Sequence, residues 1–162
     1  MNTKYKYIEA PEPLSDRIDL DLDRIVFLAG SITGAENWQK RATETLLPHF
    51  NIVNPRRQSF DVSRKDIEEE QITWEYGWLR YSNILLFHFS HETVAPITLF
   101  EYGAALEWAR NYKWIKIYVS IHSDYSRKND VVIQTRLRNP EVSKNIYFSL
   151  DECLENMIKD HE

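Results

Sequence analysis

Apolar residues gather in short segments that are separated by stretches with a different period. The clearest segments are residues 25–30, 83–89 and 114–121, and shorter candidates are residues 50–54 and 145–148. A continuous apolar run of this length is typical of a strand that is buried on both faces of a parallel sheet. The sequence therefore predicts five strands.

Between these segments, apolar residues recur at the spacing of one helical face. The expected helices are residues 36–47, 63–79, 96–111, 129–137 and 149–160. Ser63 is expected to cap the second helix, and Pro96 suits the first turn of the third.

Strands and helices thus alternate along the chain, which predicts a three-layer α/β sandwich with a mostly parallel, five-stranded sheet. We assign residues 24–162 to this domain. Residues 1–23 form an expected amino-terminal arm that packs over the domain edge and contains an extended piece around residues 4–8. In such folds, ligands bind beyond the carboxyl ends of the strands, so candidate residues are sought in the loops that follow them.

The composition is that of an ordinary globular domain, with 43% hydrophobic and 28% charged residues in a chain of 162. The formal net charge of -5 argues against a surface for polymeric nucleic acid, although it is compatible with a local basic pocket. No apolar run approaches the roughly 20 residues that cross a membrane, and the amino end has no apolar signal core, which predicts a cytoplasmic protein. Cys153 is the only cysteine, so neither an internal disulfide nor a cysteine metal cluster can form.

The loop after the first strand is bracketed by Gly30 and Gly34. Glycine lets the backbone approach a ligand closely, and a following helix start offers N–H groups to an anion or a hydroxyl. The pattern is neither the dinucleotide fingerprint nor the P-loop. A ligand loop and a plain tight turn both remain open.

The second strand leads into "NPRRQSFDVS", which contains Arg56 and Arg57. Two arginines on the binding edge can hold a phosphate or a carboxylate. Spacing alone favours solvated surface charge, or ion pairs with the acids of "KDIEEE". Asp61, in the same loop, is a further candidate that can equally cap a turn.

Glu75 lies between Trp74 and Trp78, about one turn before the expected end of its helix. Tryptophans that flank a carboxylate can form the wall of a pocket. Aromatic residues at this spacing more often belong to the core. Both interpretations remain open.

Metal and cofactor sites are not expected. His88 and His91 lack a third partner at metal-ligand spacing. Asn129 follows two basic residues at the start of the fourth expected helix, and spacing alone favours a basic helix entry without function.

Glu101 is surrounded by mostly apolar residues in the segment "APITLFEYGAAL". It lies about a turn and a half into the helix that begins at Pro96, where the helix dipole helps to keep it ionised, although the effect fades beyond the first turn. Burial would act in the opposite direction and raise its pKa. These considerations alone favour a glutamate that faces outward.

Five segments, in this order, resemble the nucleoside 2-deoxyribosyltransferase family, in particular the branch with "NPRR" and "PI(S/T)L-E-G" motifs. The resemblance runs from Arg24 to Leu137. Its landmarks are "VFLAGSITG", "NPRRQSFD", "EQITWEYGWLRYSNILLF", "APITLFEYGAAL" and "YSRKNDVVI". It implies a flavodoxin-like fold and a homo-oligomer in which neighbouring subunits complete each other's sites.

The resemblance also implies a reaction: cleavage of the N-glycosidic bond of a 2'-deoxynucleoside, with transfer of the sugar to another nucleobase. The family's nucleophile falls on Glu101, which would form a covalent deoxyribosyl-enzyme. The acid that handles the base falls on Glu75, where better-known members have aspartate. No cofactor is implied, and the partners are nucleosides or nucleotides and free bases.

Further positions are implied as substrate contacts. The first-strand loop places Gly30, Ser31 and Ile32 at the sugar or its 5' end, and Asn129 is the polar group that a neighbouring subunit would supply. The remaining expected contacts are Asn54, Arg56, Arg57, Asp61 and Trp74.

Two departures from the family pattern keep alternatives open. Ala95 occupies the place of a second acid that transferases carry, and the chain ends in "KDHE" without a terminal aromatic residue. One alternative is hydrolysis of deoxynucleosides or of their 5'-monophosphates, for which Arg56 and Arg57 would suit the 5' anion. The others are a nucleotide-binding module without catalysis and N-glycosidic cleavage of a different substrate, such as NAD.

Overall fold

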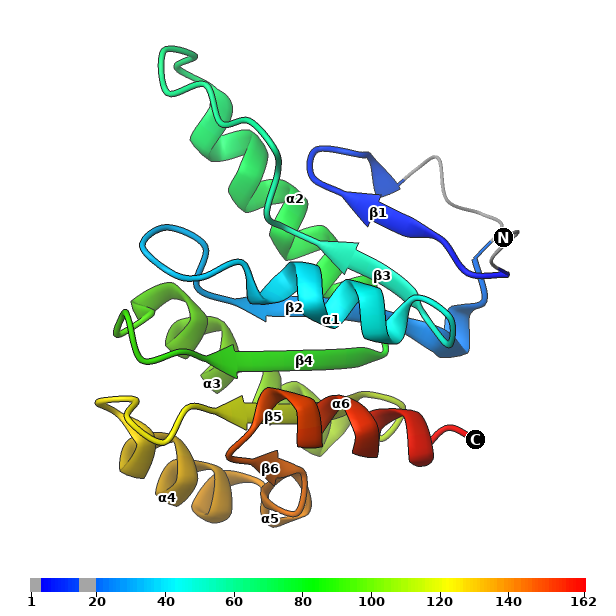
Figure 1. Cartoon of the computed structure of the whole chain (residues 1–162), viewed down its shortest axis with the longest axis vertical. Coiled ribbons are helices and arrows are strands. Elements are labelled where there is room, and N and C mark those ends of the chain that lie inside the picture. The colour runs from blue at the N-terminus through cyan, green and yellow to red at the C-terminus, as the bar shows by residue number, and fades with distance from the viewer. Residues whose placement is uncertain (1–3, 15–19) are drawn as a thin grey trace.

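Six parallel strands form one sheet that carries helices on both faces (Figure 1). This computed structural model describes residues 4–14 and 20–162. The strands are β1 (Tyr7–Glu9), β2 (Ile25–Gly30), β3 (Asn51–Asn54), β4 (Ile84–Phe89), β5 (Lys116–Ile121) and β6 (Ile146–Tyr147). The helices are α1 (Trp38–Leu46), α2 (Ile67–Tyr81), α3 (Pro96–Asn111), α4 (Lys128–Arg138), α5 (Pro140–Ser143) and α6 (Leu150–Lys159), with a 3₁₀ turn at Leu22–Arg24.

The predicted fold class is confirmed, and the predicted strand count is wrong. All strands are parallel, and the sheet has six of them in the order β1-β3-β2-β4-β5-β6. The additional strand is β1, which lies within the expected arm and pairs with β3. Only Ile8 of its three residues is buried, so the strand lacks the continuous apolar run by which the other strands were recognised. The rest of the expected arm includes residues 1–3 and 15–19, which lie outside the described residues.

Helix α2 begins later than the sequence indicates. Its first residue is Ile67, preceded by Asp66, whereas Ser63 was expected to cap it. Ser63 instead donates hydrogen bonds from its backbone N and its hydroxyl to Asp61 Oδ1, at 3.0 and 2.6 Å. The prediction of a Ser63 cap is therefore wrong, because the serine belongs to a turn that is closed by Asp61.

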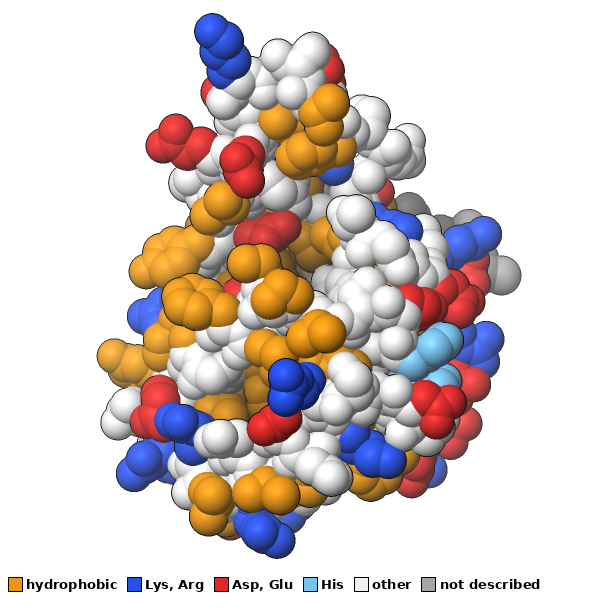
Figure 2. All heavy atoms as spheres, turned by 90° about the vertical axis from the view of Figure 1, so that its left-hand side faces the viewer, with side chains coloured by type: hydrophobic (Ala, Val, Ile, Leu, Met, Phe, Trp, Pro, Cys, Tyr) orange, Lys and Arg blue, Asp and Glu red, His pale blue; other side chains and the backbone are white. Residues whose placement is uncertain are grey.

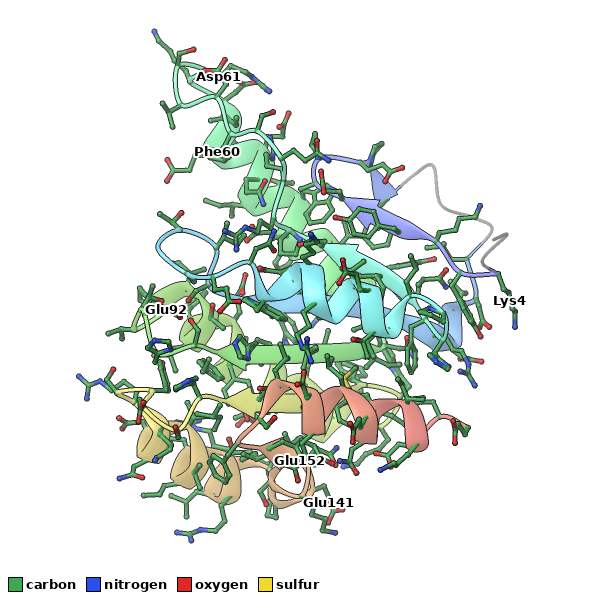
Figure 3. The ribbon with its side chains drawn as sticks, viewed as in Figure 1. Lys4, Phe60, Asp61, Glu92, Glu141 and Glu152 are labelled. Atoms are coloured by element: carbon green, nitrogen blue, oxygen red, sulfur yellow. The ribbon has the colours of Figure 1, made fainter. Side chains whose placement is uncertain are left out.

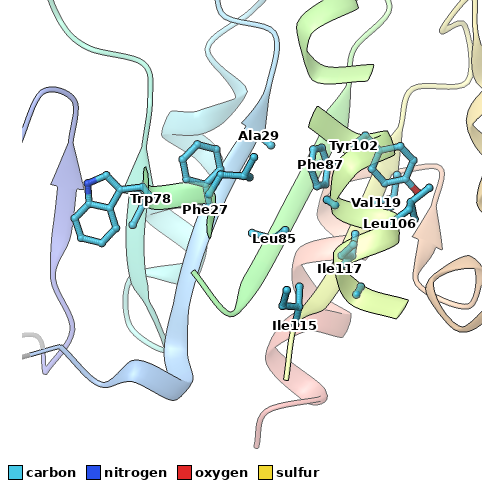
Figure 4. Close-up of a cluster of buried hydrophobic side chains, with 14 of the residues drawn as sticks. Phe27, Ala29, Trp78, Leu85, Phe87, Tyr102, Leu106, Ile115, Ile117 and Val119 are labelled. Atoms are coloured by element: carbon cyan, nitrogen blue, oxygen red, sulfur yellow. The ribbon is translucent and has the colours of Figure 1, made fainter. Parts of the chain in front are cut away.

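Two hydrophobic cores lie on opposite faces of the sheet, because alternate residues of each strand point to opposite sides. On one face, α2, α3 and α4 cover strand residues such as Phe27 and Phe87, and Trp78 and Tyr102 fill the space between them (Figure 4). On the other face, α1 and α6 pack over the remaining strand residues through side chains that include Trp38. Residues that face α2 and α3 at the ends of the strands therefore share one side of the sheet.

The chain changes direction at β2, because β3 lies on one side of it and β4 on the other. The loops that follow β2 and β4 consequently diverge at the carboxyl edge of the sheet, where α/β folds form their binding crevice. Two contacts join these loops in this structure. Ser31 Oγ lies 2.6 Å from Thr93 Oγ1, and the backbone N of Glu36 donates to Glu92 Oε1 at 3.4 Å.

Candidate active site

Glu75 of α2 and Glu101 of α3 are half-buried side chains that interact electrostatically on the same face of the sheet. Burial raises the pKa of Glu101 to about 7, and the negative charge of Glu75 adds to the shift. The prediction that α3 begins at Pro96 is confirmed. Glu101 therefore does not point freely into water, as the helix pattern alone had favoured.

The environment of Glu75 distinguishes it from Glu101. Burial raises the pKa of Glu75, whereas a hydrogen bond from Gln71 and the positive charge of Arg57 lower it. Gln71 Nε2 donates to Glu75 Oε1 at 2.6 Å and also to the backbone oxygen of Pro55 at 2.9 Å. With a donor and a cation beside it, Glu75 holds a negative charge more readily than Glu101, so a single proton on the pair favours Glu101.

The start of α3 is fixed from two directions. Ala95, the residue before it, has a left-handed backbone with φ 51°, which an alanine adopts at a cost of about 1 kcal/mol. One residue after Glu101, the hydroxyl of Tyr102 lies 2.6 Å from Thr135 Oγ1, and its ring contacts Phe87 and Phe89 edge-on. These contacts set the rotation of the helix and therefore the direction of Glu101.

Trp74 is buried in the core beside Phe27, at a ring distance of 6.4 Å. The indole N–H groups of Trp74 and Trp78 both donate to the backbone oxygen of Glu12, at 2.6 and 3.3 Å. The geometry thus favours the core interpretation of the two tryptophans. A contact between Trp74 and a substrate stays a prediction.

The loop after β2 is held by two side chains from the first turn of α1. The backbone oxygen of Ser31 accepts hydrogen bonds from Trp38 Nε1 at 3.2 Å and from Gln39 Nε2 at 3.1 Å. Ser31 is buried and Ile32 is half-buried. The loop is therefore a defined surface at the crevice, and its expected contact with the sugar stays a prediction.

Gly30 is required by packing. A Cβ atom at this position would lie 2.6 Å from Trp38 Cζ2 and 2.7 Å from the backbone oxygen of His88. We expect Gly30→Ala to lower the free energy of unfolding by about 1 to 3 kcal/mol, because the strand backbone cannot move away without breaking its ladder. Urea denaturation measures this loss. The matched control is Gly77→Ala in α2, where a Cβ meets no atom within 4 Å, and equal stability of the two variants would contradict the packing role.

The two arginines after β3 have different surroundings. Arg56 is held by the backbone of the β2–α1 loop, with Nη1 donating to Glu36 O at 3.0 Å and Nη2 to Ala35 O at 3.3 Å. Arg57 is turned toward α2, where Nη1 donates to Glu70 Oε1 at 2.9 Å. Arg57 therefore forms the ion pair with an acid of "KDIEEE" that the sequence left open, and Arg56 binds the backbone of the β2–α1 loop.

Asn54 connects the same strand end to β1. Its Nδ2 donates to the hydroxyl of Tyr7 at 2.9 Å, and its Oδ1 accepts from the backbone N of Arg56 at 2.9 Å. A groove of about 460 Å³ lies here, and Tyr7 and Lys40 line it together with Asn54, Arg56 and Arg57. Tyr7 lies in the extended piece expected around residues 4–8, but it was not a candidate site residue, because its place beside Asn54 depends on the pairing of β1 with β3.

Among the described residues, no hydrogen bond or ion pair joins Asp61 or Asn129 to Glu75 or Glu101. Asp61 is exposed in the loop that projects beyond α2, beside Phe60 (Figure 3). Its hydrogen bonds to Ser63 favour the turn interpretation. Asn129 is exposed in the first turn of α4, and its expected role toward a neighbouring subunit stays a prediction.

His88 is buried at the end of β4, and its ring lies 4.8 Å from that of Trp38. Burial lowers its pKa to about 4, so it is neutral at physiological pH. Within residues 4–14 and 20–162, no group of three or more His, Cys, Asp and Glu side chains comes together in a way that could hold a metal ion.

The face that carries the carboxyl ends of the strands is rich in hydrophobic side chains, with acidic side chains between them (Figure 2). Exposed hydrophobic residues come from three neighbouring helices: Ile72, Tyr76, Ile97, Phe100, Ile133 and Leu137. Phe100, one residue before Glu101, is 79% exposed.

These features define an α/β sandwich protein with a pair of half-buried carboxylates beside the crevice of a parallel sheet. The chain belongs to the nucleoside 2-deoxyribosyltransferase-like family, whose model matches residues 23–125. Membership implies an enzyme of the nucleoside deoxyribosyltransferase type, with deoxyribosyl transfer or glycosidic cleavage as its chemistry and nucleosides or nucleobases as substrates.

Among solved structures, the chain is similar to the TIR domains of the activated Roq1 resistosome that directly recognises the pathogen effector XopQ. The sequence identity is 12%, the TM-score is 0.52, and the match covers 85% of this chain and 98% of that chain. At this identity the likeness concerns the fold alone. No curated protein sequence matches the chain. Among the helices of the described residues, none has the length and apolar character that a membrane span requires.

Proposed function

We propose that this protein cleaves the N-glycosidic bond of 2'-deoxynucleosides through a covalent deoxyribosyl-Glu101 intermediate and transfers the sugar to another nucleobase. The observation that carries the proposal is the Glu75–Glu101 pair, in which burial and mutual repulsion raise the pKa of Glu101 to about 7. Titratable groups with such shifts gather at catalytic sites. The family match supports the same assignment, as does the position of Glu101 in the second turn of α3, the helix that follows the carboxyl end of β4.

In the first half of the reaction, a Glu101 oxygen attacks C1' of the sugar from the face opposite the base. The C1'–N bond breaks, its electron pair leaves with the base, and a base nitrogen takes a proton from Glu75. In the second half, a nitrogen of the incoming base attacks C1' and releases the Glu101 carboxylate. Glu75 then takes back the proton of the incoming base, so both glutamates return to their initial state.

This chemistry requires the single proton of the pair to sit on Glu75 and the negative charge on Glu101. The surroundings favour the reverse distribution, since Gln71 and Arg57 stabilise the Glu75 anion. A base whose nitrogen accepts a hydrogen bond from Glu75 stabilises the protonated form of that side chain. Substrate binding therefore moves the proton from Glu101 to Glu75 and leaves Glu101 as the nucleophile.

Hydrolysis is the second candidate, and Ala95 favours it. The resemblance places an acid of the transferases at this position, and Ala95 is a buried residue without a polar side chain. In hydrolysis, water attacks C1' of the intermediate in place of a second base. A 5'-monophosphate is a less suitable substrate than the sequence indicated, because Arg56 already donates to two backbone oxygens and to Gln39 Oε1.

The exposed hydrophobic residues of α2, α3 and α4 support the expected homo-oligomer. A second copy that covers Tyr76 and Phe100 would remove large apolar side chains from water beside the glutamate pair. In this arrangement the neighbouring chain would shield the site from solvent, as the resemblance implies.

Incubation with a 2'-deoxynucleoside, with and without a second free base, separates the two reactions. We expect a new deoxynucleoside only when the acceptor base is present, measured by chromatography of bases and nucleosides. Free base without an acceptor would establish hydrolysis. Saturable nucleoside binding with no base release at high protein concentration would contradict both and leave a binding module.

A further inference from the structure

Three buried polar atoms without a hydrogen-bond partner belong to the two side chains that act on Glu75. They are Nε and Nη2 of Arg57 and Oε1 of Gln71. Leaving buried donors and acceptors unpaired is energetically costly, so such groups are rare in folded proteins. Their coincidence at one place beside the proposed acid points to a ligand with complementary groups.

The orientation of the Gln71 amide follows from its contacts. Both acceptors that surround its nitrogen, Pro55 O at 2.9 Å and Glu75 Oε1 at 2.6 Å, require N–H donors. A flipped amide would place two oxygens against each other at Pro55. Oε1 is therefore the free end of the side chain, and it calls for a donor.

Arg57 is held so that one edge of its guanidinium remains free. Its side chain is 7% exposed, its Nη1 is bound to Glu70, and its planar group lies 5.7 Å from the ring of Phe60. Nε and Nη2 form the edge from which arginine donates two parallel hydrogen bonds. In Arg41 the same edge binds both carboxylate oxygens of Asp151.

An anion does not suit the free edge of Arg57, because Glu70 is already bound to this side chain and the carboxylate of Glu75 lies nearby. A phosphate would meet these carboxylates and the Gln71 oxygen. A neutral ligand with two adjacent acceptors followed by a donor fits all three free atoms. The 6-oxopurine ring has this order along its edge: N7, O6 and then N1–H, and arginine commonly binds N7 and O6 together.

We propose that Arg57 and Gln71 select a 6-oxopurine as the base of the substrate, with Arg57 donating to N7 and O6 and Gln71 Oε1 accepting from N1–H. This inference rests on the proposed function for the identity of the reaction. Nitrogens N3 and N9 remain to take the proton from Glu75 when the base leaves. Adenine presents an amino group where the Arg57 edge needs an acceptor, and pyrimidines lack the second acceptor. The ring of Phe60, which lies 5.7 Å from the Arg57 guanidinium, is 48% exposed.

Binding of free bases by calorimetry tests the selection without requiring turnover. We expect hypoxanthine to bind on the order of 10-fold to 100-fold more tightly than adenine, the discrimination that a bidentate arginine contact provides. Arg57→Lys keeps the charge beside Glu70 and removes the planar pair of donors, so the preference should be lost. Arg64→Gln is the matched control, because Arg64 also pairs with Glu70 but is exposed, and it should keep the preference.

A second measurement does not depend on any variant. 7-Deazahypoxanthine lacks the N7 acceptor and should bind the unaltered protein about tenfold more weakly than hypoxanthine. Equal binding of hypoxanthine and adenine, or a preference that survives in Arg57→Lys, would overturn the inference. A hypoxanthine preference in a protein that releases no base from 2'-deoxyinosine would keep the inference and reject the proposed reaction.

Discussion

Replacing Glu101 by glutamine is expected to reduce base release from a 2'-deoxynucleoside by roughly a thousandfold or more, the scale on which loss of a covalent nucleophile acts. Glutamine keeps the shape of the side chain but cannot supply the oxygen anion that attacks C1'. The substitution also removes the carboxyl group whose pKa burial raises to about 7, so the folded protein should not be destabilised by it. The loss of activity would thus be chemical and not structural.

Initial rates measured by chromatography check this expectation, and intact-protein mass spectrometry adds a second readout. A deoxyribosyl adduct should form on the unaltered protein during turnover and be absent from Glu101→Gln. Glu107→Gln, on the same helix, is the control, because Glu107 pairs only with Arg110 and Arg138 in the contacts that the described residues show. Full turnover by Glu101→Gln would exclude Glu101 as the nucleophile.

The pH dependence of kcat/KM is expected to fall as the pH rises above about 7. The reaction needs one ionised and one protonated carboxyl group, so the active form of the Glu75–Glu101 pair is the form that holds a single proton. Burial and the charge of Glu75 raise the pKa for losing that proton to about 7. Above this pH both groups are ionised, and no acid remains to protonate the leaving base. At lower pH, addition of a second proton removes the nucleophile, so the profile is bell-shaped.

Glu75→Gln should lose the alkaline limb of this profile together with roughly 10²-fold to 10⁴-fold of the rate, the usual range for a general acid. Its loss should be much smaller with 4-nitrophenyl 2'-deoxyribofuranoside, whose stabilised phenolate leaves without a proton. A rate that rises through pH 7 in the unaltered protein would show that ionisation of Glu101 alone limits the reaction. Equal losses with both substrates would remove Glu75 from the role of acid.

The sequence predicted the strands that are buried on both faces, because a continuous apolar run leaves few alternatives. It placed an extended piece around residues 4–8 but did not predict that this piece joins the sheet as β1, because only one of the three β1 residues is buried and the pairing with β3 spans more than 40 positions of the chain. Helix α3 was located by Pro96. The start of α2 was misplaced, because a serine before an acid-rich segment serves a turn as readily as a cap.

The sequence predicted those candidate site residues that belong to recognisable motifs. The resemblance singled out Glu75 and Glu101, and the structure brings them within electrostatic range of each other. It also singled out Arg56 and Arg57 as a pair, but their opposite surroundings follow from the position of α2 and the β2–α1 loop. Gln71 was not recognised as a site residue. A glutamine one turn before a glutamate is common on helix surfaces, and its role becomes visible only when the fold places Pro55 and Arg57 near it.

The pairing of β1 with β3 has a consequence for the limits of the folded unit. The family match begins at residue 23, whereas the sheet extends back to Tyr7. A chain shortened to the matched region would leave the backbone amides of Asn51–Asn54 without partners on their outer side and would expose surface that Ile8 now covers. An open strand edge of this kind is a template for pairing with other chains. Residues 7–9 therefore cover the outer edge of β3 against strand pairing with other chains, although they lie outside residues 23–125, which the family model matches.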